Sequence, residues 1–220
     1  MDYIPPVSSS WVWRRICSVK QDIIHGFMDG KWVVQPDGYT PTGCYEWLKD
    51  SRPTIPWHNV IWNVWVIPKQ QFLEWLVAQG ALNTLDKLIQ YGLQVENKFL
   101  LCGHAEENMA HLFFDCQYSR RMISAIQKLT GCQLPQTNSI TWCATRGGSK
   151  VQQGVHVALV HGAIYRVWSQ RNQCRVERVV MRPEWVAKEM VQDVKTRIKG
   201  RENLNLNVSD IGWLHQSKLM

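Results

Sequence analysis

The sequence contains no long hydrophobic run, and no apolar stretch approaches the roughly 18 to 20 residues that a membrane-spanning helix needs. Its first residues lack the basic start and apolar segment of a secretory leader. The seven cysteines are odd in number and scattered, which does not suit a disulfide framework. We therefore expect a soluble intracellular protein, in the nucleus or the cytoplasm, with reduced thiols and no membrane partner.

Several catalytic patterns are also missing. The 18 acidic residues are scattered, and no Asp-Asp doublet flanked by strand-like residues occurs among them. Polymerase and nuclease chemistry gathers such carboxylates around two metal ions. The H-E-x-x-H and G-x-S-x-G motifs are absent, and RGGSK at residues 146–150 lacks the spacing of a phosphate-binding loop. These absences predict that the chain is not an enzyme.

Positive charge is abundant in one part of the chain. The formal net charge is +7, which permits binding to a polyanion without establishing it. Residues 171–201 contain nine basic and four acidic residues, which gives this segment a net charge of +5. The nine are Arg171, Arg175, Arg178, Arg182, Lys188, Lys195, Arg197, Lys199 and Arg201. The sequence leaves open whether they bind nucleic acid phosphates or form a solvated helix face.

Hydrophobic periodicity predicts a mainly helical fold. Helical spacing places Trp57, Ile61, Trp62 and Trp65 on one buried stripe, and puts Phe72, Trp75, Leu76 and Gln79 on a shared face of a helix opening at Pro68. In the N-terminal part, Ser10 can cap a helix. The turn residues 35–38, flanked by strand-like segments, suggest a small β-hairpin. The expected fold class is therefore mainly α with a small N-terminal β-hairpin (α+β).

The pattern also suggests how the chain is divided. We expect an N-terminal helix and hairpin segment over residues 1–56 and a zinc-knuckle-like helical module over residues 57–131. Residues 132–150 are rich in turn formers and form the best candidate linker. Residues 151–220 should then hold long basic C-terminal helices, the second of which begins at Pro183.

Cys102, His111 and Cys116 are spaced as C-x8-H-x4-C. Two thiolates and an imidazole suit Zn²⁺, which prefers four nitrogen or sulfur ligands in a tetrahedron. On one continuous α-helix, side chains five residues apart point roughly 140° away from each other. A metal site therefore requires the helix to end near Asp115 and Cys116 to turn back, with the next helix starting around Tyr118.

The fourth ligand and the site itself have alternatives. Water, His104 or Glu106 could complete the coordination, and His104 would need a tight turn because it follows Cys102 by only two residues. Alternatively, the apolar residues around the cysteines pack as a small core that buries them as free thiols. These residues are Phe99, Leu100, Leu101, Leu112, Phe113 and Phe114. Both interpretations remain open.

Three segments in order, WVIPKQQFLEWL, ALNTLDKLIQYG and LCGHAEENMAHLFFDCQYSRR, carry a resemblance to a known family. They resemble the reverse-transcriptase zinc-binding domain that follows the polymerase in plant LINE-type (non-LTR) retrotransposon proteins. The segments GYTPTGCYEWL and GAIYRVWSQRN are also similar, so the resemblance covers most of residues 11–172. The family pattern has a further cysteine three residues before Cys102, where this chain has Phe99.

The resemblance implies a non-catalytic domain that binds RNA or DNA and is braced by structural zinc. It implies Cys102, His111 and Cys116 as the remaining ligands, with His104 as a possible fourth. A second hypothesis is a domesticated protein–protein interaction module, with a degenerate metal-free site, that binds its partner through an aromatic surface. A Phe99→Cys change should raise zinc affinity if the rest of the site keeps its geometry.

Overall fold

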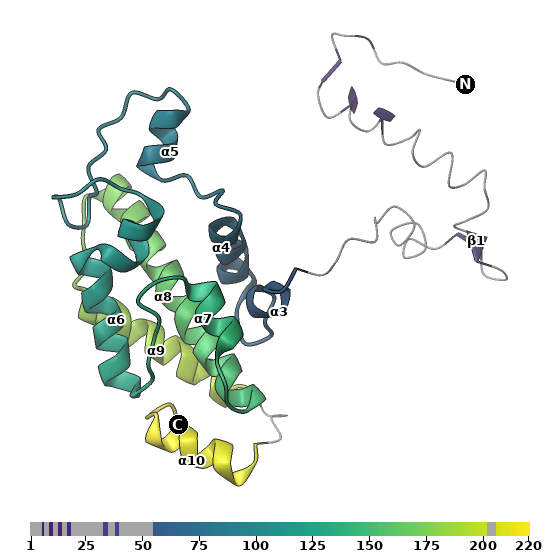
Figure 1. Cartoon of the computed structure of the whole chain (residues 1–220), viewed down its shortest axis with the longest axis vertical. Helices are drawn as coiled ribbons and strands as arrows, with labels where there is room; N and C mark the ends of the chain where they lie inside the picture. The colour runs from purple at the N-terminus through teal and green to yellow at the C-terminus, as the bar shows by residue number, and fades with distance from the viewer. Residues whose placement is uncertain are drawn as a thin grey trace. The chain divides into compact units, whose positions relative to one another are not determined.

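The structure is a computed structural model, and it divides the chain into two compact units, residues 1–54 and 55–220 (Figure 1). It describes residues 55–201 and 206–220 in full. Of the first 54 residues it describes only 6, 9, 10, 13, 14, 17, 18, 33, 34, 38 and 39. The candidate site lies in the second unit.

The described part of the first unit holds one short β pairing. Strand β1 (Val33–Val34) runs antiparallel to β2 (Gly38–Tyr39), with Val33 opposite Tyr39. A hairpin needs further strands or a packed helix to be stable in water, and two residues a side are too few to form a layer of the fold. The expected α+β class with its N-terminal β-hairpin is therefore wrong, and the fold is mainly α.

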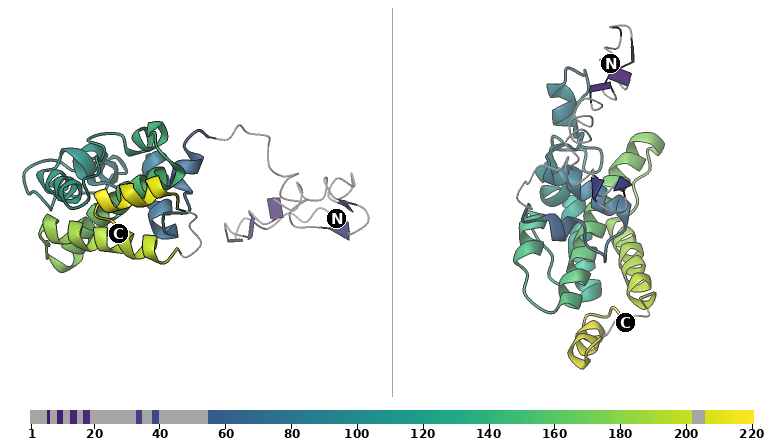
Figure 2. Two further views of the ribbon diagram at one scale, coloured as in Figure 1. Left: turned by 90° about the horizontal axis from the view of Figure 1, so that it is seen from below. Right: turned by 90° about the vertical axis from the view of Figure 1, so that its right-hand side faces the viewer.

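The second unit is a bundle of helices around α8. Its elements in chain order are α3 (His58–Ile61), α4 (Pro68–Ala78), α5 (Leu85–Gln90), the π-helical turn η1 (His111–Asp115), α6 (Gln117–Thr130), α7 (Ser139–Thr145), α8 (Lys150–Glu177), α9 (Pro183–Lys199) and α10 (Val208–Gln216). Helix α8 contacts α4, η1, α6, α7, α9 and α10, while α6 packs along α9 (Figures 1 and 2). No helix in the described ranges is both long and apolar enough to cross a membrane.

The helix ends follow local chemistry. Helix α8 begins with a capping box, in which the Ser149 hydroxyl accepts the Gln152 N–H and the Gln152 side chain accepts the Ser149 N–H. Helix α9 begins at Pro183, as expected. Helix α6 ends at Gly131, whose φ of +69° lies in the left-handed region that glycine adopts without strain.

The tryptophan stripe is only half buried. Ile61 and Trp65 lie in the core, but α3 is a single turn and Trp62 is 43% exposed. The Trp65 indole packs directly on Gly154 of α8, where an added Cβ would lie 2.1 Å from a ring atom. Any larger residue at position 154 would therefore push this tryptophan out of the core.

Helix α4 buries a different face from the expected one. Gln70, Leu73 and Glu74 face α8 and are buried, whereas Phe72 is 55% exposed. Glu74 accepts a 2.7 Å hydrogen bond from the Ser139 hydroxyl. Its other carboxylate oxygen has no hydrogen-bond partner among the described residues.

Glu74 and His161 form a buried titratable pair. The Glu74 carboxylate lies 4.0 Å from the His161 ring, and neither ring nitrogen has a hydrogen bond within the described part of the chain. Burial raises the pKa of Glu74 to about 7 and lowers the pKa of His161 to about 3. At slightly acidic pH both groups are therefore neutral, and rising pH forces a buried negative charge.

We expect Glu74→Gln to stabilise the protein more at pH 8 than at pH 5. Because the pKa of Glu74 is raised from 4.5 to about 7, its contribution to stability is complete below pH 4.5 and is lost as pH rises through 7. The difference in free energy of unfolding between variant and wild type should grow by about 2 to 3 kcal/mol between the two pH values. Urea unfolding measures it, with the exposed Glu96→Gln as control. Parallel pH profiles for wild type and Glu74→Gln would contradict the assignment.

Two helices of this unit were not anticipated. The segment expected to be a linker, residues 132–150, contains α7, which packs against α3 and α8. The C-terminal helix α10 starts at Val208 and is capped by Asn207, whose side chain accepts the Asp210 N–H. It buries Leu214 and contacts α8. The described cysteines, from Cys17 to Cys174, form no disulfide bond with one another.

Candidate metal centre

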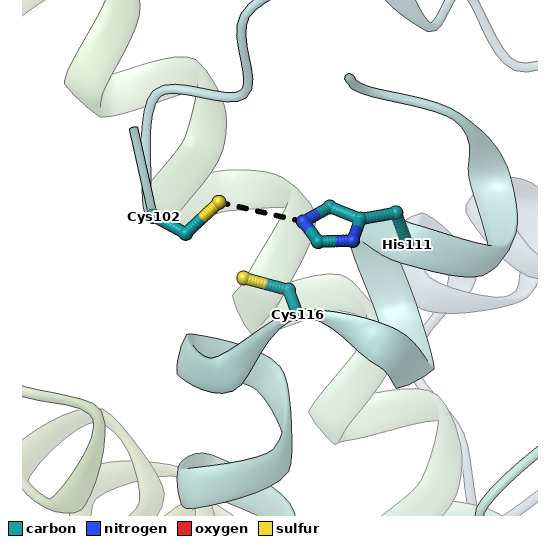
Figure 3. A group of neighbouring side chains, drawn as sticks. All are labelled: Cys102, His111 and Cys116. Carbon is teal, nitrogen blue, oxygen red and sulfur yellow. Dashed lines mark hydrogen bonds between the residues drawn. The ribbon is translucent and has the colours of Figure 1, made fainter. Parts of the chain in front are cut away.

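Cys102, His111 and Cys116 come together in the structure (Figure 3). Their potential ligand atoms all lie within 4.8 Å of one another. The Cys102 Sγ lies 3.4 Å from the His111 Nε2, so this ring nitrogen faces the cluster. Within the described ranges, no other group of three His, Cys, Asp or Glu side chains is compact enough to hold a metal ion.

A π-helical turn aligns two of the three candidate ligands, His111 and Cys116. The Cys116 N–H donates to the His111 carbonyl at 2.9 Å, an i to i+5 bond that places residue 116 over residue 111. The turn ends at Asp115, and Cys116 is extended with ψ of 135° before α6 begins at Gln117. The expected break near Asp115 is confirmed, and the π turn is its physical form.

Side chains complete the hydrogen bonding of this turn. The Ser119 hydroxyl donates to the Leu112 carbonyl at 2.6 Å, and the Arg120 guanidinium donates to the Phe114 carbonyl at 3.0 Å. At the start of the turn, the Asn108 side chain accepts the His111 N–H at 2.8 Å. These three hydrogen bonds help to fix the irregular backbone at His111 and Cys116.

The third candidate ligand, Cys102, lies on a tight loop. The Phe99 carbonyl accepts the Gly103 N–H at 2.8 Å, and the Phe99 N–H donates to the Ala105 carbonyl at 2.9 Å. Gly103 has a φ of +69°, which suits glycine. These bonds curl the chain around Cys102 and direct its sulfur toward His111 (Figure 3).

The Phe99 side chain supplies no ligand atom to the cluster, and the Phe99 carbonyl oxygen lies 3.9 Å from the Cys102 Sγ. It is fully buried, and its ring meets the His111 imidazole edge to face, with 5.3 Å between the centroids. His104 and Glu106 are exposed and lie outside the compact group. The residues therefore fit three of the four positions that zinc prefers, and no described side chain fills the fourth.

Burial sets the protonation of the metal-free site. Desolvation, assisted by the nearby Cys102 sulfur, raises the pKa of Cys116 to about 11, against the lowering effect of the Tyr118 and Ser119 backbone N–H groups. The free thiol thus keeps its proton at neutral pH. A metal ion would have to displace that proton, so its affinity should fall as pH falls.

A buried ion pair connects the loop between Cys102 and His111 to helix α8. Glu107, which lies between Cys102 and His111 in sequence, is fully buried and accepts two hydrogen bonds from the Arg171 guanidinium of α8, one of them at 2.9 Å. It also accepts the Leu85 N–H at 3.0 Å. Arg171 is 3% exposed, so its assignment to a nucleic acid surface is wrong.

The other predicted nucleic acid contacts divide by exposure. Arg197 donates to the Trp65 carbonyl, and Arg201 stacks on the Trp65 ring, so both guanidinium groups are half-buried and engaged. Arg175 and Lys195 are also half-buried. The exposed ones are Arg178, Arg182, Lys188 and Lys199. No ion pair between described residues engages these four.

The start of α6 connects the group of Cys102, His111 and Cys116 to the turn between α8 and α9. The Tyr118 hydroxyl, two residues after Cys116, donates to the Met181 carbonyl at 3.0 Å. One helical turn further along α6, the Arg121 guanidinium forms an ion pair with the Glu184 carboxylate, with 2.7 Å between Nη2 and Oε1. Sequence reasoning did not identify these links, because they join residues 63 positions apart.

The same part of the chain matches a known family. Comparison with curated proteins and with solved structures gave no match. Residues 39–122 match the family model described as zinc-binding in reverse transcriptase, a range that includes all three clustered side chains. The family match and the cluster together support a reverse-transcriptase zinc-binding domain in this part of the chain.

Proposed function

We propose that this chain is a non-catalytic nucleic-acid-binding domain, braced by zinc and derived from the reverse transcriptase of a plant LINE-type retrotransposon. The observation that carries the proposal is the compact group of Cys102, His111 and Cys116 inside the family match. The order of the linked sequence motifs supports the LINE origin. The scattered acidic residues support a role without catalysis.

The three side chains would hold zinc as a structural cross-link. Zinc held there would have no catalytic role; Cys102 would connect its loop through the ion to His111 on the π turn and to Cys116 at the start of α6. Cys102 and His111 are half-buried, so a water molecule can complete the coordination from their side. Phe99 is fully buried and packs its ring edge to face against the His111 imidazole.

The nucleic acid surface that we propose is the basic turn, defined here as residues 178–182. It carries Arg178 and Arg182, both exposed, and the Met181 carbonyl that receives the Tyr118 hydroxyl. Zinc at Cys116 would fix the first turn of α6 and, through Tyr118, the position of the basic turn. Guanidinium groups on such a turn can contact phosphates on RNA or DNA.

Binding of single-stranded RNA tests this surface. Replacing Arg178 and Arg182 together by Gln should weaken binding, because two phosphate contacts are lost. The slope of log K against log salt should become shallower by about 1.4, which is two contacts at 0.7 each. Electrophoretic shift or fluorescence anisotropy across a salt series measures both effects.

The matched control removes the same charge elsewhere. Lys98→Gln with Lys150→Gln also removes two exposed positive charges, but leaves the basic turn intact. If the two double variants weaken binding equally, the effect is one of net charge and the assignment to the basic turn fails. If wild-type protein binds no RNA or DNA at low salt, nucleic acid binding itself fails.

The second candidate function is a protein–protein interaction module. The observation in its favour is exposed aromatic surface, since Trp185 is 66% and Phe72 is 55% exposed. Exposed aromatic side chains are typical anchors of protein interfaces. Absence of nucleic acid binding, together with absence of zinc, would favour this alternative.

A further inference from the structure

The group of Cys102, His111 and Cys116 offers only three ligand atoms of its own. Two are sulfurs, one is the His111 Nε2, and all three lie within 4.8 Å of one another. Cys116 and Phe99 are both fully buried, and the Phe99 ring stands edge to face against the imidazole. An apolar ring therefore packs against the imidazole, and no described side chain supplies a fourth ligand to the cluster.

Different metal ions tolerate such a site differently. Zn²⁺ prefers four ligands in a tetrahedron, and each missing protein ligand must be replaced by water. Cu(I) is a soft monovalent ion that thiolates bind strongly, and it is stable with three ligands in a plane. Two thiolates and one imidazole satisfy Cu(I) completely and Zn²⁺ only in part.

We propose that Cys102, His111 and Cys116 form a three-coordinate soft-metal site that accepts Cu(I) without a fourth ligand. The ratio of Cu(I) affinity to zinc affinity is therefore higher in this chain than at a centre with four protein ligands. The inference rests on the metal site of the proposed function and adds the ion that this chain's ligand set suits best. On binding, the cysteine thiols release protons to solvent, and the copper stays Cu(I). No oxidant or reductant takes part.

Binding competition under anaerobic conditions tests the selectivity. Zn²⁺ and Cu(I) affinities are each measured against a chromophoric chelator of known affinity, for wild type and Phe99→Cys. A cysteine at this position adds the fourth ligand that zinc lacks. We expect zinc affinity to rise at least about 100-fold, since losing even an outer contact costs 10- to 100-fold, and Cu(I) affinity to rise less than about tenfold. Phe72→Cys, which adds an exposed thiol on α4, should change neither affinity.

X-ray absorption at the copper edge tests the wild-type protein without any variant. Two sulfur neighbours and one nitrogen neighbour would support the proposal, and four neighbours would overturn it. Equal gains in zinc and Cu(I) affinity on Phe99→Cys would also overturn it. If the wild type binds zinc but not Cu(I), this inference fails while the proposed function stands. If it binds neither ion, the metal site of the proposed function fails as well.

Discussion

Replacing Arg171 by Met should lower the free energy of unfolding by about 3 to 5 kcal/mol, the usual cost of removing one partner of a buried ion pair. The substitution leaves the Glu107 carboxylate fully buried without its cation. The loop between Cys102 and His111 would also lose its attachment to α8. Urea unfolding followed by circular dichroism measures the change.

A double variant separates the pair from simple packing. Glu107→Gln with Arg171→Met removes both charges and keeps an oxygen to accept the Leu85 N–H. We expect it to recover much of the lost stability, since neutral residues of similar size often replace a buried pair well. Arg178→Met, at an exposed position, should change stability by less than about 0.5 kcal/mol. A loss below about 1 kcal/mol in Arg171→Met would show that the buried pair is not essential to the fold.

Replacing Cys116 by Ala should lower zinc affinity by more than about 100-fold, because a ligand is lost from a site with only three. The matched control is Cys132→Ala. Cys132 is also a buried free thiol, but it lies outside the metal cluster. Chelator competition measures zinc affinity for both variants, and circular dichroism confirms that each is folded.

The two variants distinguish a metal site from a packed core. If the cysteines only fill space, Cys116→Ala and Cys132→Ala should both lose stability and neither should change metal binding. Equal zinc affinity in the wild type and in Cys116→Ala would contradict the assignment of Cys116. Loss of zinc in both variants would point to general unfolding.

Helix geometry made the chain break between His111 and Cys116 predictable. The spacing from His111 to Cys116 is incompatible with one continuous α-helix, and this alone required a break near Asp115. The sequence did not indicate that the break would be a π turn, because its stabilising partners, Ser119 and Asn108, are ordinary polar residues. The end of α6 at Gly131 and the start of α9 at Pro183 were predictable from the glycine and proline there, whereas the Ser149 cap of α8 lay inside the expected linker.

Long-range partners were not predictable from local pattern. Arg171 was counted among the surface bases, yet it falls at helical spacing from the buried residues Ile164, Val167 and Cys174. That spacing was the available signal, and Glu107, its partner, is 64 residues away. The face that α4 buries likewise depends on its contact with α8, which local hydrophobicity does not reveal.

The central claim of the proposed function is that Cys102, His111 and Cys116 hold a zinc ion. The most direct measurement is the zinc content of the wild-type protein, purified without chelator and measured by elemental analysis. The account predicts close to one zinc per chain, removable by a chelator and restored by added zinc. A ratio near zero that stays near zero after zinc is added would contradict it.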